Sequence, residues 1–312
     1  MSGIGIITNP HSKLNKRNPQ RTALLGYILG EKGRLEVTNN LDDLGRVARE
    51  FKSKNIGILA INGGDGTICR TLTAFIQVYG NAPLPKVALL RGGTINVLAN
   101  NLGIAGSPEQ VLYRLVEVYS NEEKEFDTQV LTSIEVEGSY GFLFGNGAAA
   151  SFLKEYYKRK SGPLGAFLWA IAVWFSGLWN GDLYRSVISD QVQELFPIGS
   201  PSITHSSLAV FVSTLKKMPL GYPMFRSVQL GSDEFQCVSF TVSAKDAVWK
   251  LPWTMVKLHQ QNNENKMSFT TSAMKIEAEG AKFEYTLDGE LYTTATKALD
   301  IRTGPKIEFI RI

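Results

Sequence analysis

Residues 56–67 read IGILAINGGDGT, a continuous apolar run that ends in a glycine-rich loop. Such a run is typical of a buried strand, and Gly63, Gly64 and Gly66 mark a loop after it. Paired glycines let backbone N–H groups come close to a ligand, and a helix behind them presents its positive end to anions. We therefore predict a strand, a phosphate-binding loop and a helix, with Asp65 available for a metal or a reacting group.

A second glycine loop repeats this arrangement. Residues 87–101 read VALLRGGTINVLANN, so an apolar run again precedes Gly92 and Gly93 and a helix-like pattern follows them. Two such loops suggest one cradle for phosphate groups. Neither loop ends in the Lys-Ser/Thr of a Walker P-loop, and Gly3 and Gly5 lie before or within the first predicted strand, so a Rossmann fingerprint is also excluded.

Strand and helix patterns alternate up to about residue 125. The expected strands are 5–8, 34–38, 56–61 and 87–90, and the expected helices are 21–30, 41–52, 68–79 and 108–118. This alternation predicts a parallel sheet with helices on both faces. Ligands of such sheets bind beyond the carboxyl ends of the strands, where both glycine loops and Asn9 would lie.

The pattern changes after residue 127. The expected strands are 130–136, 208–212, 236–242, 267–271, 275–278 and 283–287; residues 151–179 are helical, and 190–204 and 216–223 are loop-like. We therefore predict an α/β nucleotide-binding domain over residues 1–127. An all-β sandwich domain with a helical insertion follows over residues 128–312, and its last residues can pack back near the first domain.

Composition indicates a soluble globular protein, with 44% hydrophobic and 20% charged residues among 312. The net charge of +4 is too small to imply a nucleic-acid partner. Cys69 and Cys237 show no metal-type spacing, so we expect reduced thiols in a cytoplasmic protein. No signal peptide is expected, because residues 3–7 read as a strand.

The segment 163–179 is almost uncharged and rich in Phe, Trp, Leu and Ala. It is slightly short for a membrane-spanning helix, so we predict a buried or a lipid-facing amphipathic helix. Its aromatic residues could form a wall against acyl chains or simply pack in the core; they are Phe167, Trp169, Trp174, Phe175 and Trp179. One basic cluster precedes it, made of Lys154, Lys158, Arg159 and Lys160.

Several short motifs, in chain order, resemble those of the diacylglycerol kinase catalytic family, which has the sphingosine kinases among its relatives. They are NPHS at 9–12, Thr38, GGDGT at 63–67, GTINVLA at 93–99, FD at 126–127, GPL at 162–164 and DGE at 288–290. The resemblance implies a Rossmann-like or phosphofructokinase-like three-layer α/β domain, followed by a β-sandwich. It also implies phosphorylation of a lipid hydroxyl, with ATP and Mg²⁺, in the cleft between them.

The resemblance also implies roles for individual residues. Asp288 would be the general base or the group that orients the lipid hydroxyl, and Asp65 would act through Mg²⁺ bound to ATP. A carboxylate near a cleft can accept an alcohol's proton, although Asp-Gly is also a common β-turn sequence. The nucleotide-binding set would be Asn9, Thr38, Gly63, Gly64, Asp65, Gly66, Thr67, Gly93, Thr94, Asn96 and Glu290.

Two departures from the family pattern bear on function. Arg70 stands where the family often has Glu, and it could pair with phosphate or weaken a metal or nucleotide contact. The middle region lacks the family's usual metal-binding sequence, and Asp233 is the candidate ligand for a structural metal.

Two other functions stay open, a non-catalytic lipid- or nucleotide-binding relative and an NAD kinase, which shares GGDGT. As partners we expect a lipid substrate at a membrane surface, with peripheral membrane contact, and no nucleic acid; a homodimer stays open.

Overall fold

The N-terminal part alternates strands and helices, as the sequence predicts. A computed structural model describes residues 3–121, 123–159, 163–179, 181–189, 191–250, 265–278, 284–294 and 296–312. The N-terminal strands are β1 (Ile4–Thr8), β2 (Gly33–Val37), β3 (Ile58–Asn62) and β4 (Lys86–Leu89). The helices are α1 (Lys13–Arg17), α2 (Arg21–Leu29), α3 (Leu41–Ser53), α4 (Asp65–Tyr79), α5 (Val97–Asn101) and α6 (Pro108–Ser120), with a 3₁₀ turn η1 (Gly30–Lys32).

The C-terminal part is rich in strands. They are β5 (Thr128–Val136), β6 (Ser139–Gly141), β7 (Leu143–Asn146), β8 (Gln191–Pro197), β9 (Ile203–Ser207), β10 (Ala209–Ser213), β11 (Phe235–Phe240), β12 (Lys266–Thr271), β13 (Ala273–Ala278), β14 (Glu284–Leu287), β15 (Glu290–Thr293) and β16 (Ala298–Ile310). The helices are α7 (Ala148–Lys158), α8 (Pro163–Gly177) and α9 (Asp182–Arg185), with a 3₁₀ turn η2 (Pro219–Gly221).

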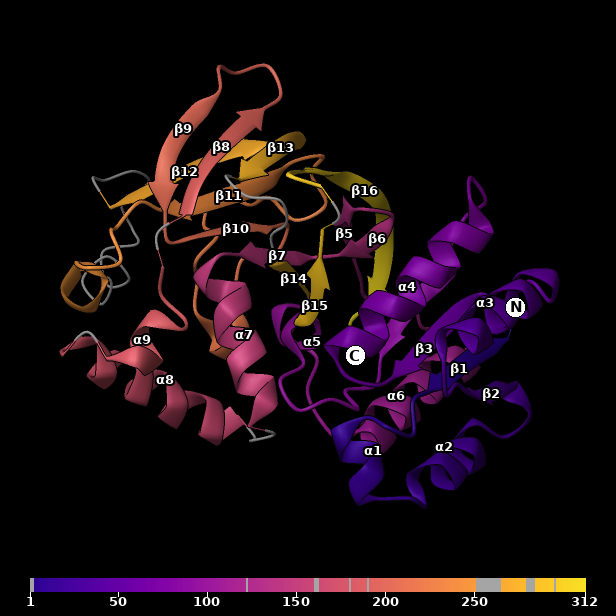
Figure 1. Ribbon diagram of the computed structural model, residues 1–312. Coiled ribbons are helices and arrows are strands. Elements are labelled where there is room, and N and C mark those ends of the chain that lie inside the picture. The colour runs from indigo at the N-terminus through magenta and orange to yellow at the C-terminus, as the bar shows by residue number, and fades with distance from the viewer. Residues whose placement is uncertain are drawn as a thin grey trace.

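The four N-terminal strands form a parallel sheet in the order β2-β1-β3-β4. Helices α3 and α4 pack together on one face, and α2 and α6 pack together on the other (Figure 1). Every residue of β1 and β3 is therefore buried. This order is that of a doubly wound sheet, and it differs from the 3-2-1-4 order of the Rossmann dinucleotide fold.

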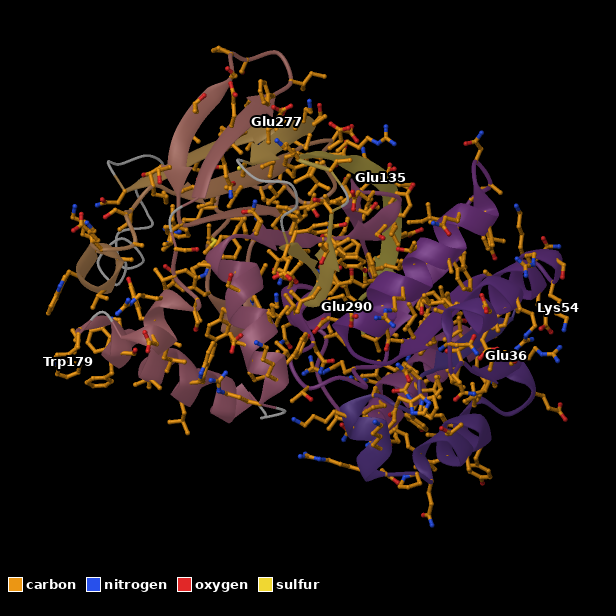
Figure 2. The ribbon with its side chains drawn as sticks, viewed as in Figure 1. Glu36, Lys54, Glu135, Trp179, Glu277 and Glu290 are labelled. Atoms are coloured by element: carbon orange, nitrogen blue, oxygen red, sulfur yellow. The ribbon has the colours of Figure 1, made fainter. Side chains whose placement is uncertain are left out.

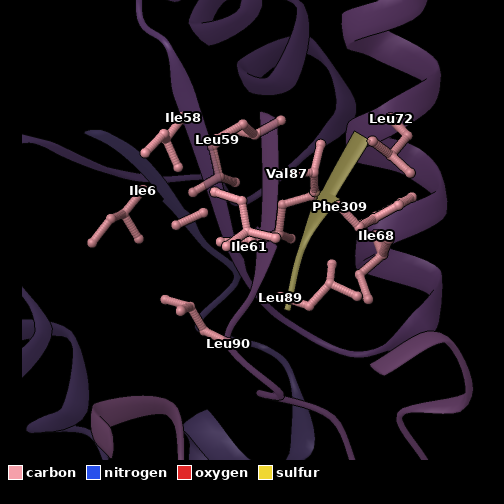
Figure 3. Close-up of a cluster of buried hydrophobic side chains, with 14 of the residues drawn as sticks. Ile6, Ile58, Leu59, Ile61, Ile68, Leu72, Val87, Leu89, Leu90 and Phe309 are labelled. Carbon is pink, nitrogen blue, oxygen red and sulfur yellow. The ribbon is translucent and has the colours of Figure 1, made fainter. Parts of the chain in front are cut away.

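The last strand, β16, joins the two parts of the protein. Phe309 and Ile310 at its end pair in parallel with β4 on one side, while the strand pairs antiparallel with β5 up to the same residues and with β13 at its start. Figure 3 shows Phe309 among the apolar side chains of the N-terminal core. One sheet thus continues from the α/β part, in the order β2-β1-β3-β4-β16-β13-β8-β9.

A second sheet has the order β12-β11-β10-β7-β14-β15. It packs on those strands of the first sheet that come from the C-terminal part of the chain. The two sheets share a buried core that includes Phe144 and Tyr285 from the second sheet and Ile276 and Ile301 from the first. The prediction of an α/β part followed by a β-rich part is therefore confirmed. The domain limits at residues 127 and 128 stay a prediction, because one sheet runs through both parts.

Three expectations about elements need correction or completion. The range 190–204, which was expected to be loop-like, contains strand β8 and the start of β9. These two strands form a hairpin. The helical stretch 151–179 is two helices, α7 and α8, and β16 was not anticipated as a strand. In this hairpin a polar residue, Gln193, occupies a buried position, so the sequence lacks the apolar alternation that predicts a strand. Its Oε1 accepts a hydrogen bond from Nδ2 of Asn146 at 3.2 Å.

None of the helices in the described ranges has the length and apolar character needed to cross a membrane.

Replacing Phe309 by Ala should destabilise the α/β and β parts together. The ring is fully buried and makes an edge contact with Phe142, with 5.7 Å between centroids. Truncation of a buried Phe costs about 3–5 kcal/mol, so chemical denaturation should show a lower free energy of unfolding for both parts. Val130→Ala, at a partly exposed position of β5, is the control with a small expected effect. Loss of stability in one part alone would contradict the bridging role of β16.

Candidate active site

The two glycine loops contact each other backbone to backbone at the carboxyl ends of β3 and β4. A Cβ atom on Gly93 would lie 2.5 Å from the Cα of Gly64, and one on Gly92 would lie 2.4 Å from Oδ1 of Asn62. Real Cβ atoms essentially never come this close to other atoms, so a larger residue at either position would push the loops apart. The glycines are therefore required for the contact that forms the cradle.

The second loop is held in shape by Asn96. This residue has a left-handed backbone (φ +50°), a conformation that Asn tolerates better than most residues. Its Nδ2 donates to the carbonyl of Gly93 at 2.9 Å, and its Oδ1 accepts from the Gly93 amide at 3.2 Å. Asn96 therefore fixes the loop, while Thr94 is exposed beside it.

The ends of β1 and β2 complete the same edge of the sheet. Nδ2 of Asn9 donates to Oγ1 of Thr67 at 2.9 Å, which ties the end of β1 to the first turn of α4. The Thr38 amide donates to the carbonyl of Thr8 at 3.0 Å, so buried Thr38 lies at the end of β2. Asn9, Thr38 and both glycine loops thus gather at one edge, where parallel sheets bind ligands.

Asp65 is the first residue of α4 and faces the start of α5. Burial raises the pKa of Asp65, and the backbone amides of residues 96–98 act in the opposite direction. Oδ1 of Asp65 is buried and, within the described part of the chain, has no hydrogen-bond partner. A buried carboxylate oxygen that lacks a partner is costly unless a cation or ligand completes it.

Asp288 lies in the tight turn between β14 and β15. Asp288 and Gly289 both have positive φ angles, of +48° and +84°, so the β-turn alternative for Asp-Gly is structurally correct. The turn also positions the carboxylate. Oδ1 of Asp288 accepts from the amides of Phe142 at 3.1 Å and Leu143 at 2.9 Å, and Oδ2 also accepts from the Phe142 amide at 3.1 Å.

Burial, together with the smaller effect of the negative charge of Asp65, raises the pKa of Asp288 to about 7. The amides of Phe142 and Leu143 partly oppose the shift. The structure therefore brings together two carboxylates that are more than two hundred positions apart in the sequence. A carboxylate with a pKa near neutrality is suited to accept a proton at physiological pH.

Glu290 reaches from β15 over the first turn of α4. A Cβ atom on Gly66 would lie 2.0 Å from Oε1 of Glu290, so a larger residue would force this carboxylate to move from its position. Its other oxygen, Oε2, forms an ion pair with Nη2 of Arg70. Figure 2 shows Glu290 beside the start of α4. The pair links the α/β part to the β part, and it explains the departure at Arg70 as a contact with Glu290.

Tyr157 is a site residue that sequence motifs do not reveal. Its hydroxyl donates to the carbonyl of Gly289 at 2.5 Å. Burial raises the pKa of Tyr157 to about 12, with smaller contributions from the charges of Glu290 and Asp65. The C-terminal end of α7 therefore contacts the Asp288 turn. The sequence carries no signal for this, because the contact depends on how α7 packs against β14.

Metal binding is limited by the donors that the chain supplies. Across the described ranges, no three His, Cys, Asp or Glu side chains are grouped to hold a metal ion. Asp233 lies elsewhere, with an exposed side chain that pairs with Lys306 at 2.9 Å. Its role as a structural metal ligand stays a prediction. At the glycine loops, Oδ1 of Asp65, which has no hydrogen-bond partner among the described residues, is a suitable ligand for Mg²⁺. Proteins usually bind this ion through one or two carboxylates together with the phosphate oxygens of a substrate.

Comparison with known proteins agrees with this geometry. Residues 4–128 match the diacylglycerol kinase catalytic domain. A stretch of 83 residues is 34% identical to a "Probable lipid kinase YegS" of Escherichia fergusonii and covers 27% of each chain. Another of 97 residues is 32% identical to the protein of that name from Shigella flexneri, covering 30% of this chain and 31% of that protein. The match thus spans about a third of these relatives or less.

Solved structures extend the likeness over the whole chain. "Crystal structure of a putative diacylglycerol kinase from Bacillus anthracis str. Sterne" describes a chain with a TM-score of 0.71 and 15% identity, covering 100% of this chain and 97% of that one. A second structure from that organism, of "a diacylglycerol kinases", has a TM-score of 0.67 and 14% identity over the same shares. At this identity the likeness establishes the fold.

Residues 4–128, less than half of the chain, are thus similar to the diacylglycerol kinase catalytic domain. The resemblance based on the short motifs is confirmed. The motifs of this part converge on one edge of the sheet, and the DGE turn of the β part faces them.

Replacing Gly93 by Ala should weaken nucleotide binding, because the added methyl group would separate the two loops. We expect at least a tenfold weaker Kd for ATP by calorimetry, equivalent to about 1.4 kcal/mol. Gly26→Ala is the matched control, since nothing lies within 4 Å of its added Cβ and Gly26 is in a helix. Equal affinity for ATP in both variants would show that the loop contact is not needed for binding.

The pKa of Asp288 predicts a pH dependence of stability. The folded-state pKa, about 7, exceeds the ordinary value of 3.8, so between these values the folded chain holds a proton that the unfolded chain releases. Ionisation of Asp288 therefore lowers stability as pH rises from 4 to 7. Asp288→Asn, which stays neutral, should gain stability relative to the parent over this range in denaturant titrations. Exposed Asp182→Asn serves as control; a constant difference between Asp288→Asn and parent would contradict the shifted pKa.

Proposed function

We propose that the protein is a lipid kinase that transfers the γ-phosphoryl group of ATP, with Mg²⁺, to a hydroxyl of diacylglycerol or a related lipid. One observation carries the proposal. The Asp288 carboxylate, with a pKa of about 7, faces Asp65 and the glycine loops from the other part of the protein. This arrangement supports a nucleotide on one side and a hydroxyl acceptor on the other.

The glycine loops would hold the phosphate groups of ATP. Gly64 and Thr94, which follow the buried Gly63 and Gly93, are partly exposed and exposed, respectively, so their backbone amides can reach an anion, and the start of α4 adds a positive dipole end. Mg²⁺, bound through Asp65 and phosphate oxygens, would neutralise part of the phosphate charge. The hydrogen bond from Asn9 to Thr67 keeps the first turn of α4 in place.

Asp288 would take the proton of the lipid hydroxyl. Oδ1 accepts from the amides of Phe142 and Leu143, whereas Oδ2 accepts only from the Phe142 amide, so Oδ2 has more capacity for a further partner. As the phosphoryl group moves to the acceptor oxygen, that oxygen loses its proton to Oδ2. Phosphoryl transfer depends mainly on positioning and charge neutralisation, so a base of modest strength suffices.

The Arg70–Glu290 pair favours one alternative, a non-catalytic relative that binds a nucleotide or a lipid. The pair lies across the first turns of α4, where it could restrict access to the phosphate cradle. We favour the kinase, because Glu290 can hold Arg70 beside the cradle as a positive charge for phosphate.

We further propose that the protein acts in the cytoplasm, in peripheral contact with a membrane. Its role would lie in phospholipid metabolism.

Incubation with ATP, Mg²⁺ and a mixed lipid extract tests the proposal, with mass spectrometry to find phosphorylated products. We expect a phosphorylated lipid that depends on both ATP and Mg²⁺. Nucleotide binding without any phosphorylated lipid would support the non-catalytic alternative. Formation of NADP from NAD in a parallel reaction would support an NAD kinase instead.

Asp288→Asn should lower kcat by a factor of about 10²–10⁴, the usual contribution of a general base. The KM for ATP should change little, because the carboxylate faces the acceptor. In the parent, kcat should rise as pH increases through about 7, where Asp288 loses its proton. The control is Asp182→Asn on the surface of α9. Unchanged kcat in Asp288→Asn would remove this residue from the mechanism.

A further inference from the structure

Helix α8 leaves apolar side chains exposed along one side. No residue of Pro163–Gly177 is charged, yet Leu168 is 57% exposed and Phe175 is 50% exposed. Beyond the helix end, Trp179 is 78% exposed and lies at the outer edge of the molecule in Figure 2. Helices that are apolar all round are normally buried, so this side requires a covering partner.

The opposite side of α8 is firmly packed, which fixes the orientation of the exposed one. Trp169 is buried against Phe152 of α7, with ring centroids 4.7 Å apart. Val173 is also buried. At the edge of this packed side, Trp174 is 39% exposed, and its indole N–H donates to the carbonyl of Val248 at 2.9 Å. Trp249, which follows Val248 in the chain, is 65% exposed and extends the apolar surface. We define the α8 face as Leu168, Ile171, Phe175, Trp179 and Trp249.

Basic side chains predominate around this face. The segments that pack on α8 or follow it are 154–159, 181–189 and 243–250, and they carry six basic and three acidic residues. We call these three segments the basic rim; their net charge is +3, six basic minus three acidic, and one of the six, Lys154, pairs with Glu284 outside the rim. Arg159 lies over the ring of Trp169, with its guanidinium carbon 4.7 Å from the centroid. Exposed Trp residues between Lys and Arg are typical of helices that lie in the interface of an anionic membrane.

The α8 face is also connected to the candidate active site. Tyr157, near the end of α7, donates to the carbonyl of Gly289 in the Asp288 turn, while Phe152 and Arg159 contact Trp169. Helix α7 thus extends from the catalytic turn to α8 (Figure 1). A bilayer on the α8 face would hold its lipids beside this turn.

We infer that the α8 face docks on the surface of an anionic lipid bilayer, with α8 lying in the plane of the interface. A second copy of the chain is a poorer occupant, because a two-fold contact through this face would bring two basic rims together. The inference deepens the proposed function, since it assigns the surface through which a lipid substrate is reached.

Sedimentation with vesicles tests the inference without using activity or nucleotide. The probes are phosphatidylcholine vesicles and vesicles of phosphatidylcholine with phosphatidylglycerol. The parent should bind the anionic vesicles, and the variant Leu168→Ser/Phe175→Ser/Trp179→Ser should bind at least tenfold more weakly. The matched control, Leu24→Ser/Tyr27→Ser/Tyr113→Ser, removes exposed apolar side chains from α2 and α6 and should bind like the parent.

A charge variant, Lys158→Glu/Lys250→Glu, should lose the preference for anionic vesicles. Denaturant titration verifies that every variant folds. Absence of vesicle binding by the parent, or equal loss in the α2/α6 control, would overturn the inference. The inference would also be overturned if sedimentation velocity showed a dimer that only the Leu168→Ser/Phe175→Ser/Trp179→Ser variant dissociates. That result would identify a second copy of the chain as the occupant of the α8 face. Vesicle binding without lipid phosphorylation would leave the docking surface intact and reject only the kinase.

Discussion

The pairing of β16 with β4 and β5 is the constraint on which the site depends. Because this strand is hydrogen-bonded to both parts at once, the β part is attached to the edge of the parallel sheet through a continuous backbone ladder. Its Phe309 ring fills the N-terminal core, so a change in the relative position of the two parts would expose apolar surface. The position of Asp288 relative to the glycine loops follows from this attachment.

The second constraint is the contact between the two glycine loops. Gly64 and Gly93 approach so closely that backbone groups, and not side chains, line the cradle. Asn96 holds one loop, and the Asn9–Thr67 hydrogen bond holds the other. Asp65 lies where the loops meet, so its charge acts on Asp288 and contributes to the raised pKa of that residue. The shape of the cradle thus depends on backbone geometry more than on any one side chain.

Local sequence patterns predicted the α/β part and its glycine loops well. Apolar runs, loop glycines and the capped helix α6 are determined by neighbouring residues, so they are visible in the sequence. Strand β16 was not predicted, because Gly304 and Pro305 interrupt it and its pairing shifts register between Thr303 and Lys306. Its strand structure comes from partners far away in the chain.

Long-range contacts account for the other site features that sequence did not supply. The Arg70–Glu290 pair joins residues 220 positions apart, and Tyr157 reaches Gly289 only because α7 packs beside β14. The resemblance placed Asp288 at the site, but its raised pKa depends on burial and on the charge of Asp65. Such shifts are set by the tertiary environment, which one sequence does not show.

The central claim is that Asp65 and Asp288 form one electrostatically coupled site across the two parts of the protein. Carboxyl ¹³C NMR titration measures it directly, with the Asp288 signal assigned from its loss in Asp288→Asn. The parent should give a pKa of about 7 for Asp288. Asp65→Asn should lower this pKa, because it removes a neighbouring negative charge. A pKa for Asp288 near 3.8 in the parent, or one that does not respond to Asp65→Asn, would contradict the account.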